Sequence, residues 1–438
     1  VLVIGSLFAV FALPYKEIGE EWRSSGLTGK LTVPKNVPAT WFNLFRRHKL
    51  PATITFSSAQ GTVSKVIHPP EDDVQQIDFN LEFDYPYSGF PQDILLNISS
   101  RYEEKRPHIS ITWTTPDGSE FYPKSPSLET ENTYVFSEYL DSRLYVMKNE
   151  AWKSWFVTSG QNRTPEFYAL FADPQAEEPI ALPGNYQLNV SALGFEPDTD
   201  VDIEFVLLGQ VFGLAGTDYL RRDLLVPLLW GLPFALAFGL VGATMITIFA
   251  MIIAAVGVWF GGWVDNLIQR LTEVTMIIPI LAVGVLLYAL YDISLWTVLI
   301  IVVIFFAFSS PTKAFRAALI QVKEAPYIEA AHAYGASNSR IIFKYMIPVI
   351  IPVLIPQLVT LIPAMVFLEA TLGIMNVYDP RFPTWGRVIY EALRENALWG
   401  GYPYWVLEPI ALLLLTGLAF SLLGFALERV LNPRLLEK

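Results

Sequence analysis

The chain has 438 residues, of which 53% are hydrophobic, 14% aromatic and only 16% charged. This composition excludes an ordinary soluble protein and indicates membrane-spanning segments. Cysteine is absent, which excludes disulfides, thiolate metal sites and a cysteine nucleophile. The net charge of −12 belongs to one half: residues 15–215 hold 28 acidic and 16 basic side chains, whereas residues 216–438 hold 14 of each. We therefore expect the two halves to face different solvents.

Residues 1–15 are apolar from Val1 to Pro14 and precede the first charge at Lys16. We interpret them as the end of a first membrane span. A cleaved signal peptide is the alternative, but the stretch has no basic residue before its apolar run and a poor small-residue cleavage pattern.

Residues 16–215 are predicted to form a β-rich, sandwich-like domain. Several segments alternate or are rich in β-branched and aromatic residues: 74–83, 108–114, 132–136, 186–192 and 201–207. Turn sequences such as Pro116-Asp-Gly118 separate them, and this spacing favours a sandwich. Three Asn-x-Ser/Thr sequons are candidate glycosylation sites: Asn97, Asn162 and Asn189. Because the second half has no sequon, charge and sequons together predict an extracytoplasmic domain.

The second half, residues 216–438, alternates long apolar runs with short polar segments. The charge-free run that begins at Leu224 is too long for one span of about 20 residues. We predict an interfacial helix to about Trp230, capped by Thr217 or Asp218, and then a span. The spans are predicted in five ranges: 232–258, 274–291 with a kink at Pro279, 293–312, 345–368 and 409–427. With the N-terminal segment this makes about six.

The segment 323–348 lies between two predicted spans, yet it is polar and helical in pattern. Four small or aromatic side chains recur at i, i+3, i+4 and i+7 on one helix face: Tyr327, Ala330, Ala331 and Tyr334. Pro326 suits the first turn, Gly335 can end the helix in a left-handed conformation, and Ser337 can cap a second helix. The segment is therefore predicted to be a helix–turn–helix at the membrane surface with a small-residue docking face.

Glu369 ends a 24-residue uncharged run, so we predict that it lies near the outer mouth of the membrane domain. An ionisable side chain at membrane depth is a candidate functional residue, here for a pore or gate. Pairing with a neighbouring helix, or reaching the membrane interface, is the alternative role for this carboxylate.

Orientation follows from the loop charges. If the acidic domain lies outside, the inside segments carry nine Lys and Arg and the short outside segments carry five. This distribution agrees with the positive-inside rule. It places the segment 323–348 and the C-terminus in the cytoplasm of a multi-pass plasma-membrane protein.

Several spaced motifs resemble permeases of dipeptide/oligopeptide-type ABC importers. They are Gly216-Thr-Asp with Arg222-Asp-Leu, Phe260-Gly-Gly-Trp263-Val-Asp265, Glu329-Ala-Ala331 with Gly335 and Pro348, Glu369-Ala-Thr-Leu-Gly373 with Pro383-Thr-Trp385-Gly386, and Asn432-Pro-Arg434. Arg221 stands where that family has a glycine. The segment 323–348 resembles the family's EAA loop, which docks on a cytoplasmic ATPase. The resemblance covers residues 216–438 and does not extend to residues 16–215.

The resemblance implies an α-helical polytopic membrane protein with the type I ABC importer permease fold and an inserted β-rich domain. It implies a non-catalytic subunit that forms half of a translocation pore for di- or oligopeptides. The ATPase-coupling residues implied are Tyr327, Glu329, Ala330, Ala331, Tyr334, Gly335 and Pro348. The implied partners are a homologous second permease, two ATP-binding cassette subunits, an extracytoplasmic solute-binding protein and the lipid bilayer, with no nucleic acid. Since the chain has no phosphate-binding loop, we expect no cofactor in it, with ATP and Mg bound by the ATPase partners.

Three alternatives remain open at this point. The same importer class also carries oligosaccharides or nickel. An ion-driven secondary transporter would show inverted repeats and ionisable residues at the midplane, and the predicted spans contain essentially none. A membrane-anchored surface-recognition protein would need a single span, so six spans and the segment 323–348 argue against it. The sequence shows no catalytic or metal-binding constellation.

Overall fold

The chain divides into two compact units. The computed structural model describes residues 31–70, 74–123, 131–135, 170–173, 176, 180–196, 198–291 and 293–431, together with Ile18, Glu20 and Trp22. The β unit comprises Gly29–Asp223, and the helical unit comprises Leu224–Lys438 with Val1–Thr28. The expected first span at 1–15 and the sequon at Asn162 lie outside the described residues.

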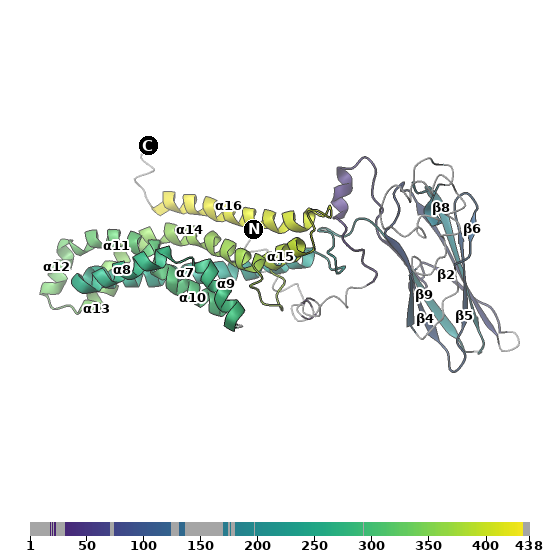
Figure 1. The fold of residues 1–438 in the computed structure, drawn as a ribbon, viewed down its shortest axis with the longest axis horizontal. Coiled ribbons are helices and arrows are strands. Elements are labelled where there is room, and N and C mark those ends of the chain that lie inside the picture. The colour runs from purple at the N-terminus through teal and green to yellow at the C-terminus, as the bar shows by residue number, and fades with distance from the viewer. Residues whose placement is uncertain are drawn as a thin grey trace. The chain divides into compact units, whose positions relative to one another are not determined.

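The β unit is a sandwich of two antiparallel sheets (Figure 1). One sheet has the order β1 (Ile54–Ser57), β9 (Asp200–Leu208), β4 (Asp93–Arg101) and β7 (Glu131–Val135). The other has the order β2 (Ser64–Ile67), β3 (Gln75–Tyr85), β8 (Gly184–Gly194), β5 (His108–Thr114) and β6 (Glu120–Phe121). A short 3₁₀ helix, η1 (Thr40–Leu44), precedes the strands. The predicted β-rich inserted domain is confirmed.

Strict alternation in the sequence builds the core of this sandwich. β3 pairs with β8 from Gln75↔Gly194 to Tyr85↔Gly184, and every second side chain of β3 is buried. Successive side chains of a strand point to opposite faces, so one face supplies the core. There the Phe83 ring lies 5.8 Å from Trp113 and 5.5 Å from Phe205, which β9 contributes from the opposite sheet.

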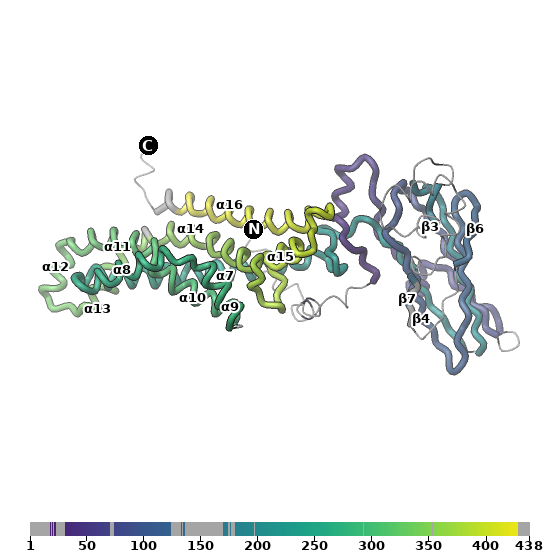
Figure 2. Tube along the Cα trace, viewed as in Figure 1, coloured from purple at the N-terminus to yellow at the C-terminus, as the bar shows by residue number. Residues whose placement is uncertain are grey.

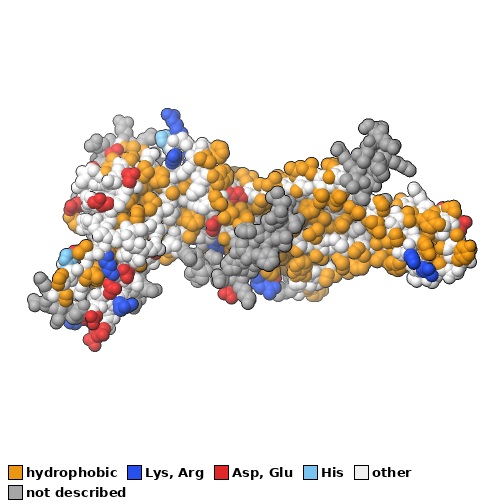
Figure 3. All heavy atoms as spheres, turned by 180° about the vertical axis from the view of Figure 1, so that it is seen from behind, with side chains coloured by type: hydrophobic (Ala, Val, Ile, Leu, Met, Phe, Trp, Pro, Cys, Tyr) orange, Lys and Arg blue, Asp and Glu red, His pale blue; other side chains and the backbone are white. Residues whose placement is uncertain are grey.

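The helical unit contains one long helix, several shorter helices and two further long helices (Figure 2). In chain order they are α7 (Leu225–Phe260), α8 (Gly262–Ile277), α9 (Ile280–Tyr291), α10 (Leu295–Ala307), α11 (Ser310–Lys323), α12 (Pro326–Ala333), α13 (Asn338–Arg340), the π-helical turn η2 (Ile341–Met346), α14 (Ile347–Ile374), α15 (Trp385–Arg394) and α16 (Tyr404–Leu431). On the face drawn in Figure 3, hydrophobic side chains form a broad band over this unit. Such a surface suits a lipid environment.

Among the described residues, four helical segments are long and apolar enough to cross a membrane: Leu225–Phe260, Leu295–Lys323, Leu354–Ile374 and Tyr404–Leu427. α8 and α9 make a fifth if they form one span, and they are bent by 75°. The bend confirms the kink predicted at Pro279. A polytopic helical membrane unit is therefore present, while the count of six spans stays a prediction.

The prediction of a separate interfacial helix ending near Trp230 is wrong. α7 runs without a break from Leu225 to Phe260, with Pro233 inside it. The run is apolar throughout, so a break would leave backbone N–H and C=O groups without water to pair with. Continuing the helix satisfies them.

Candidate coupling surface and buried carboxylate

The short helix α12 is held by one buried side chain and leaves much of its surface free. Ile328 is 2% exposed and belongs to a core that side chains from α7, α11, η2 and α14 complete. Tyr327 and Tyr334 are 44% and 92% exposed, and Ala330 is also exposed. Ala331 is half-buried, so the exposed part of the expected face consists of Tyr327, Ala330 and Tyr334.

The turn after α12 has the conformation that the sequence predicts. Gly335 has φ +77°, in the left-handed region that glycine adopts without strain. A Cβ built there would meet no atom within 4 Å, so backbone conformation and not crowding selects glycine. Ser337 then caps α13 by accepting a hydrogen bond from the backbone N–H of Arg340 at 3.4 Å.

Polar contacts that sequence reasoning missed tie this region to the neighbouring helices. Lys323 donates from Nζ to the carbonyl of Val258 at 2.8 Å, near the C-terminal end of α7, where a cation is favourable. Arg316 on α11 forms a two-pronged pair with Asp265 on α8, at 2.8 Å from Nε and 2.5 Å from Nη2. The motif ending in Asp265 signalled that this carboxylate matters, but nothing in the sequence names a partner 51 residues away.

Glu369 lies within α14 and is 1% exposed. Neither of its carboxylate oxygens has a hydrogen-bond partner among the described residues, although the Thr384 side chain lies close to it. It is 22 residues beyond Ile347, or about 33 Å along a helix at 1.5 Å per residue. That length is about the thickness of a bilayer core. Figure 1 agrees, with α12 at one end of the helical unit and α15 at the other.

Two motifs of the sequence pack against each other around this carboxylate. A Cβ on Gly373 would lie 2.7 Å from the Cα of Gly386, and one on Gly386 would lie 2.5 Å from the carbonyl oxygen of Ala370. Only glycine allows the backbones of α14 and α15 to approach so closely. Trp385 directly precedes Gly386, and its indole N–H donates a hydrogen bond to the carbonyl of Leu228 in α7 at 2.9 Å. The motif beginning at Glu369 and the motif ending at Gly386 are thus one structural feature.

A buried cation, Arg387, directly follows Gly386 in α15. Arg387 pairs with Glu391 at 2.9 Å and donates to the carbonyls of Pro380 and Trp22 at 2.7 and 2.9 Å. Its guanidinium also stacks over the Tyr378 ring, 5.1 Å from the centroid. This network was not foreseen from the sequence, because nothing there indicates that Trp22, 365 residues away, contacts Arg387. It fixes α15 in the unit that holds Glu369.

The segment with Gly216-Thr-Asp does not open a helix as predicted, because its side chains bind the β unit instead. Thr217 donates to the carbonyl of Pro34 at 2.8 Å, and Asp218 accepts from the Arg222 guanidinium at 2.5 Å. Arg221, at the position of a family glycine, keeps a left-handed backbone with φ +64°. It also donates to the carbonyl of Val33 at 2.7 Å.

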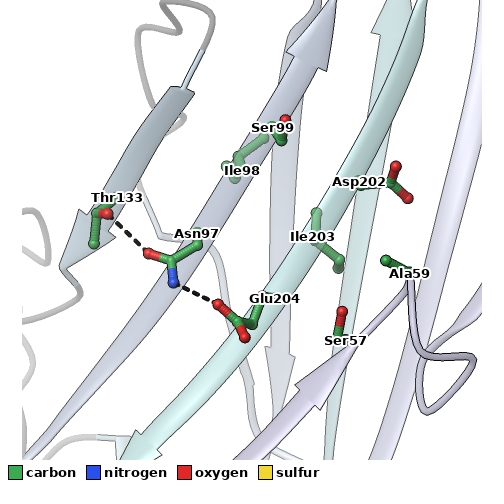
Figure 4. Close-up of a pocket in the computed structure, with 9 residues that line it drawn as sticks. All are labelled: Ser57, Ala59, Asn97, Ile98, Ser99, Thr133, Asp202, Ile203 and Glu204. Carbon is green, nitrogen blue, oxygen red and sulfur yellow. Dashed lines mark hydrogen bonds between the residues drawn. The ribbon is translucent and has the colours of Figure 1, made fainter. Parts of the chain in front are cut away.

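The described sequons lie on strands. Asn97 on β4 donates to Glu204 at 2.9 Å and accepts from Thr133 at 2.8 Å, beside an open trough of about 580 Å³ (Figure 4). A glycan there would have to displace the bond to Glu204. Asn189 is half-buried on β8. Among the described residues, no group of three or more His, Asp or Glu side chains is placed to hold a metal.

Comparison with known proteins matches the helical half. Residues 246–437 match the family described as "Binding-protein-dependent transport system inner membrane component". Over 221 residues, half of this chain, it is 24% identical to the oligopeptide transport system permease protein OppC of Bacillus subtilis, covering 71% of that protein. Over the same length it is 28% identical to the dipeptide permease DppC of B. subtilis, covering 68%. It is 25% identical to the glutathione permease GsiD of Pectobacterium atrosepticum, covering 72%.

The family match includes α12, Gly335 and Glu369, and together with the relatives it confirms the resemblance indicated by the motifs. Residues 246–437 are thus similar to binding-protein-dependent transport system inner membrane components, and the chain is similar to permeases named for peptide transport.

Proposed function

We propose that this chain is the permease subunit of an ATP-driven importer and that α12 couples it to a cytoplasmic ATPase. The complex would contain a homologous second permease, two ATP-binding cassette subunits and an extracytoplasmic solute-binding protein. This chain binds no cofactor and performs no catalysis itself; ATP and Mg are bound by the ATPase partners. The relatives named for oligopeptide, dipeptide and glutathione transport support a short peptide as the solute.

The coupling proposal rests on the difference between the two sides of α12, one of which is buried and the other exposed. One side is fixed by Ile328, while Tyr327, Ala330 and Tyr334 are free to contact another protein. A small residue between two aromatic ones forms a face on which a groove can close. The proposal concerns the residues implied by the resemblance: Tyr327, Glu329, Ala330, Ala331, Tyr334, Gly335 and Pro348.

Motion of the ATPases would reach the spans through the core around Ile328. That side chain packs in one cluster with Ala254 of α7, Phe315 of α11 and Ile350 of α14. Because packed interiors transmit strain and do not deform freely, a push on α12 moves these helices together. The spans would then reopen on the opposite side, in alternating access.

Glu369 is proposed to belong to the outer gate. It lies toward the end of α14 remote from α12, and its carboxyl group is buried without a bonded partner in the described part of the chain. Unpaired buried polar groups are rare and cluster at functional sites. In this topology the β unit is extracytoplasmic and the C-terminus is cytoplasmic.

The first test of coupling places a bulky side chain on the exposed face of α12. Ala330→Trp should overpack a close-fitting contact, which typically costs about 1–3 kcal/mol. Docking should weaken roughly 5- to 150-fold, taking 1.4 kcal/mol as tenfold. Co-purification of the ATPase subunits and solute-stimulated ATP hydrolysis measure the loss. Ala317→Trp, at an exposed alanine of α11, is the matched control and should retain both.

Gly335 allows a second version of this test, in which crowding plays no part. Gly335→Val should strain the left-handed turn by about 1–2 kcal/mol and misdirect α13. Gly335→Asn should be tolerated better, since asparagine enters this region more readily. Wild-type docking and hydrolysis in both Ala330→Trp and Gly335→Val would remove α12 as the coupling element.

The gate assignment is tested by Glu369→Gln, which preserves shape and removes the charge. Transport by the reconstituted complex should change, while assembly stays intact because the substituted side chain fits the same space. Transport and assembly are also measured for Thr384→Val, which changes the side chain beside this carboxyl group but not the carboxyl group itself. If Glu369→Gln loses assembly and transport together, the side chain serves packing and not gating.

A further inference from the structure

An exposed apolar and basic surface lies at the beginning of the β unit. Leu44 and Phe45 are 82% and 81% exposed, at the end of η1. Leu214 is also exposed, although it lies far away in the sequence. We name this surface the η1 patch; it consists of Trp41, Leu44, Phe45 and Leu214 with the basic side chains Arg46, Arg47 and Lys49.

The η1 patch is held in a defined conformation. Thr40 bonds the carbonyl of Gly213 through its backbone N–H at 3.0 Å and its hydroxyl at 2.8 Å. The Trp41 indole N–H donates to the carbonyl of Leu214 at 2.9 Å. Asn43 closes the loop by two bonds with Leu50, each of 2.9 Å. The exposed apolar side chains are therefore presented by a fixed frame, at an entropic advantage for binding.

The charges around the η1 patch differ from those of the rest of the domain. Residues 22–70 contain seven Lys and Arg and no Asp or Glu, within a region, residues 15–215, whose net charge is −12. Among the residues that the structure describes, no carboxylate pairs with Arg46, Arg47 or Lys49. Their positive charge is thus available to an external anion.

The connection of the η1 patch to the membrane is short. Leu214 is 11 residues before Leu225, where α7 begins. An extended residue spans at most about 3.6 Å. Leu214 is therefore at most roughly 40 Å from the first residue of α7, the first described membrane helix. Aromatic and aliphatic side chains beside Lys and Arg are typical of segments that lie in the lipid headgroup region.

We propose that the η1 patch inserts into the headgroup region of the bilayer that the helical unit crosses. Phe45, Leu44 and Trp41 enter the boundary of the acyl chains, while Arg46, Arg47 and Lys49 bind lipid phosphates. A lipid surface accounts both for the exposed apolar side chains and for the three cations that have no carboxylate partner among the described residues. The proposal requires only that the helical unit lies in a membrane, so it is independent of the solute and of the coupling role of α12.

The absence of cysteine makes a direct test possible. A nitroxide is attached to Phe45→Cys in the full-length chain, reconstituted in vesicles of phosphatidylcholine with phosphatidylglycerol. We expect high accessibility to oxygen, which concentrates in lipid, and low accessibility to a water-soluble nickel chelate. Leu44→Cys should give the same ordering. Ile67→Cys and Tyr122→Cys, exposed apolar or aromatic positions elsewhere in the β unit, should give the opposite one.

A charge-reversed variant tests the role of phosphate. Arg46→Glu combined with Arg47→Glu should raise the nickel accessibility at position 45 and leave that at position 122 unchanged, which also checks that the β unit is folded. Nickel accessibility at 45 equal to that at 122 would overturn the proposal. So would shielding from both oxygen and nickel that occurs only when the other transporter subunits are added, because a protein would then be the occupant.

Discussion

The two units of this chain differ in the side chains that pack their interiors. The β unit fills its core with large rings, among them Trp113, Tyr186 and Phe171, each fully buried. The helical unit also buries large rings, such as Trp385 and Trp405. In addition, the backbones of two of its helices come into contact where Gly373 lies against Gly386. The core of the β unit therefore depends on its aromatic side chains, whereas the contact between α14 and α15 depends on the absence of a side chain at Gly373 and Gly386.

The difference follows from the solvent of each unit. In water, burying apolar area stabilises a fold by roughly 25 cal/mol per Å², so large aromatic side chains are favoured. In lipid, helices gain nothing by leaving an equally apolar surrounding, and close van der Waals contact between backbones holds them together. We therefore expect the β unit to be most sensitive to a loss of side-chain volume, and the contact between α14 and α15 to be most sensitive to a gain.

The largest effect is expected from Trp113→Ala in the β unit. The Trp113 ring contacts Phe83, Phe171 and Phe205, and its indole N–H donates to the carbonyl of Leu170. Truncation of a buried tryptophan typically costs about 3–5 kcal/mol. Limited proteolysis of the purified full-length protein across a temperature series should show earlier unfolding of this unit. Tyr122→Ala, at an exposed ring, should change stability by less than about 0.5 kcal/mol.

A smaller but still clear loss is expected when volume is added to the helical unit. Gly386→Val would place a side chain 2.5 Å from the carbonyl oxygen of Ala370, where backbone cannot yield. Overpacking of this kind costs about 1–3 kcal/mol. The thermal midpoint of the protein in lipid nanodiscs should fall. Gly424→Ala is the control, because its Cβ would meet Val359 at 3.5 Å, and alanine should be neutral or stabilising. Equal tolerance of both changes would contradict the small-residue account.

The smallest effect is expected from surface charge in the β unit. Burial opposes ionisation of Asp202, but hydrogen bonds from Ser58 and Lys65 outweigh it and hold the pKa of Asp202 below its ordinary value of 3.8. A carboxyl whose pKa is lower in the folded state stabilises the fold above its ordinary pKa and loses that contribution as pH falls through the folded value. Asp202→Asn should therefore flatten the stability of the β unit below about pH 4, by no more than about 1 kcal/mol, as for exposed ion pairs. The same substitution at another aspartate of the β unit, Asp84→Asn, serves as the comparison for the pH dependence of stability.

Sequence pattern predicted the β unit well where one face of a strand is buried. The segments found by alternation coincide with β3, β5, β7, β8 and β9. β4 was not found, because Ile94, Leu95 and Leu96 are all buried and break the alternation. Leu95 packs with Val206 and Leu208 on the outer side of its sheet. Burial on both faces of a strand is a tertiary feature that an alternating sequence pattern does not indicate.

In the helical unit, local chemistry predicted the turns, and tertiary contacts could not be foreseen. The left-handed Gly335, the cap at Ser337 and the kink at Pro279 all follow from the conformational preferences of single residues. The burial of Ile328, which decides which side of α12 is free, depends on helices far away in the chain. Likewise, the motif beginning at Glu369 gave no indication that Gly373 and Gly386 touch.

Contact between α12 and an ATPase subunit can be detected by crosslinking. The sequence contains no cysteine, so the variant Ala330→Cys has a single thiol in this chain. A photoactivatable crosslinker is attached to that thiol, and the complete complex is then irradiated. We expect an adduct between this chain and an ATP-binding subunit, and no adduct when the same reagent is attached at Tyr122→Cys in the β unit. Full labelling at position 330 in an assembled, hydrolysing complex, with no such adduct, would contradict it.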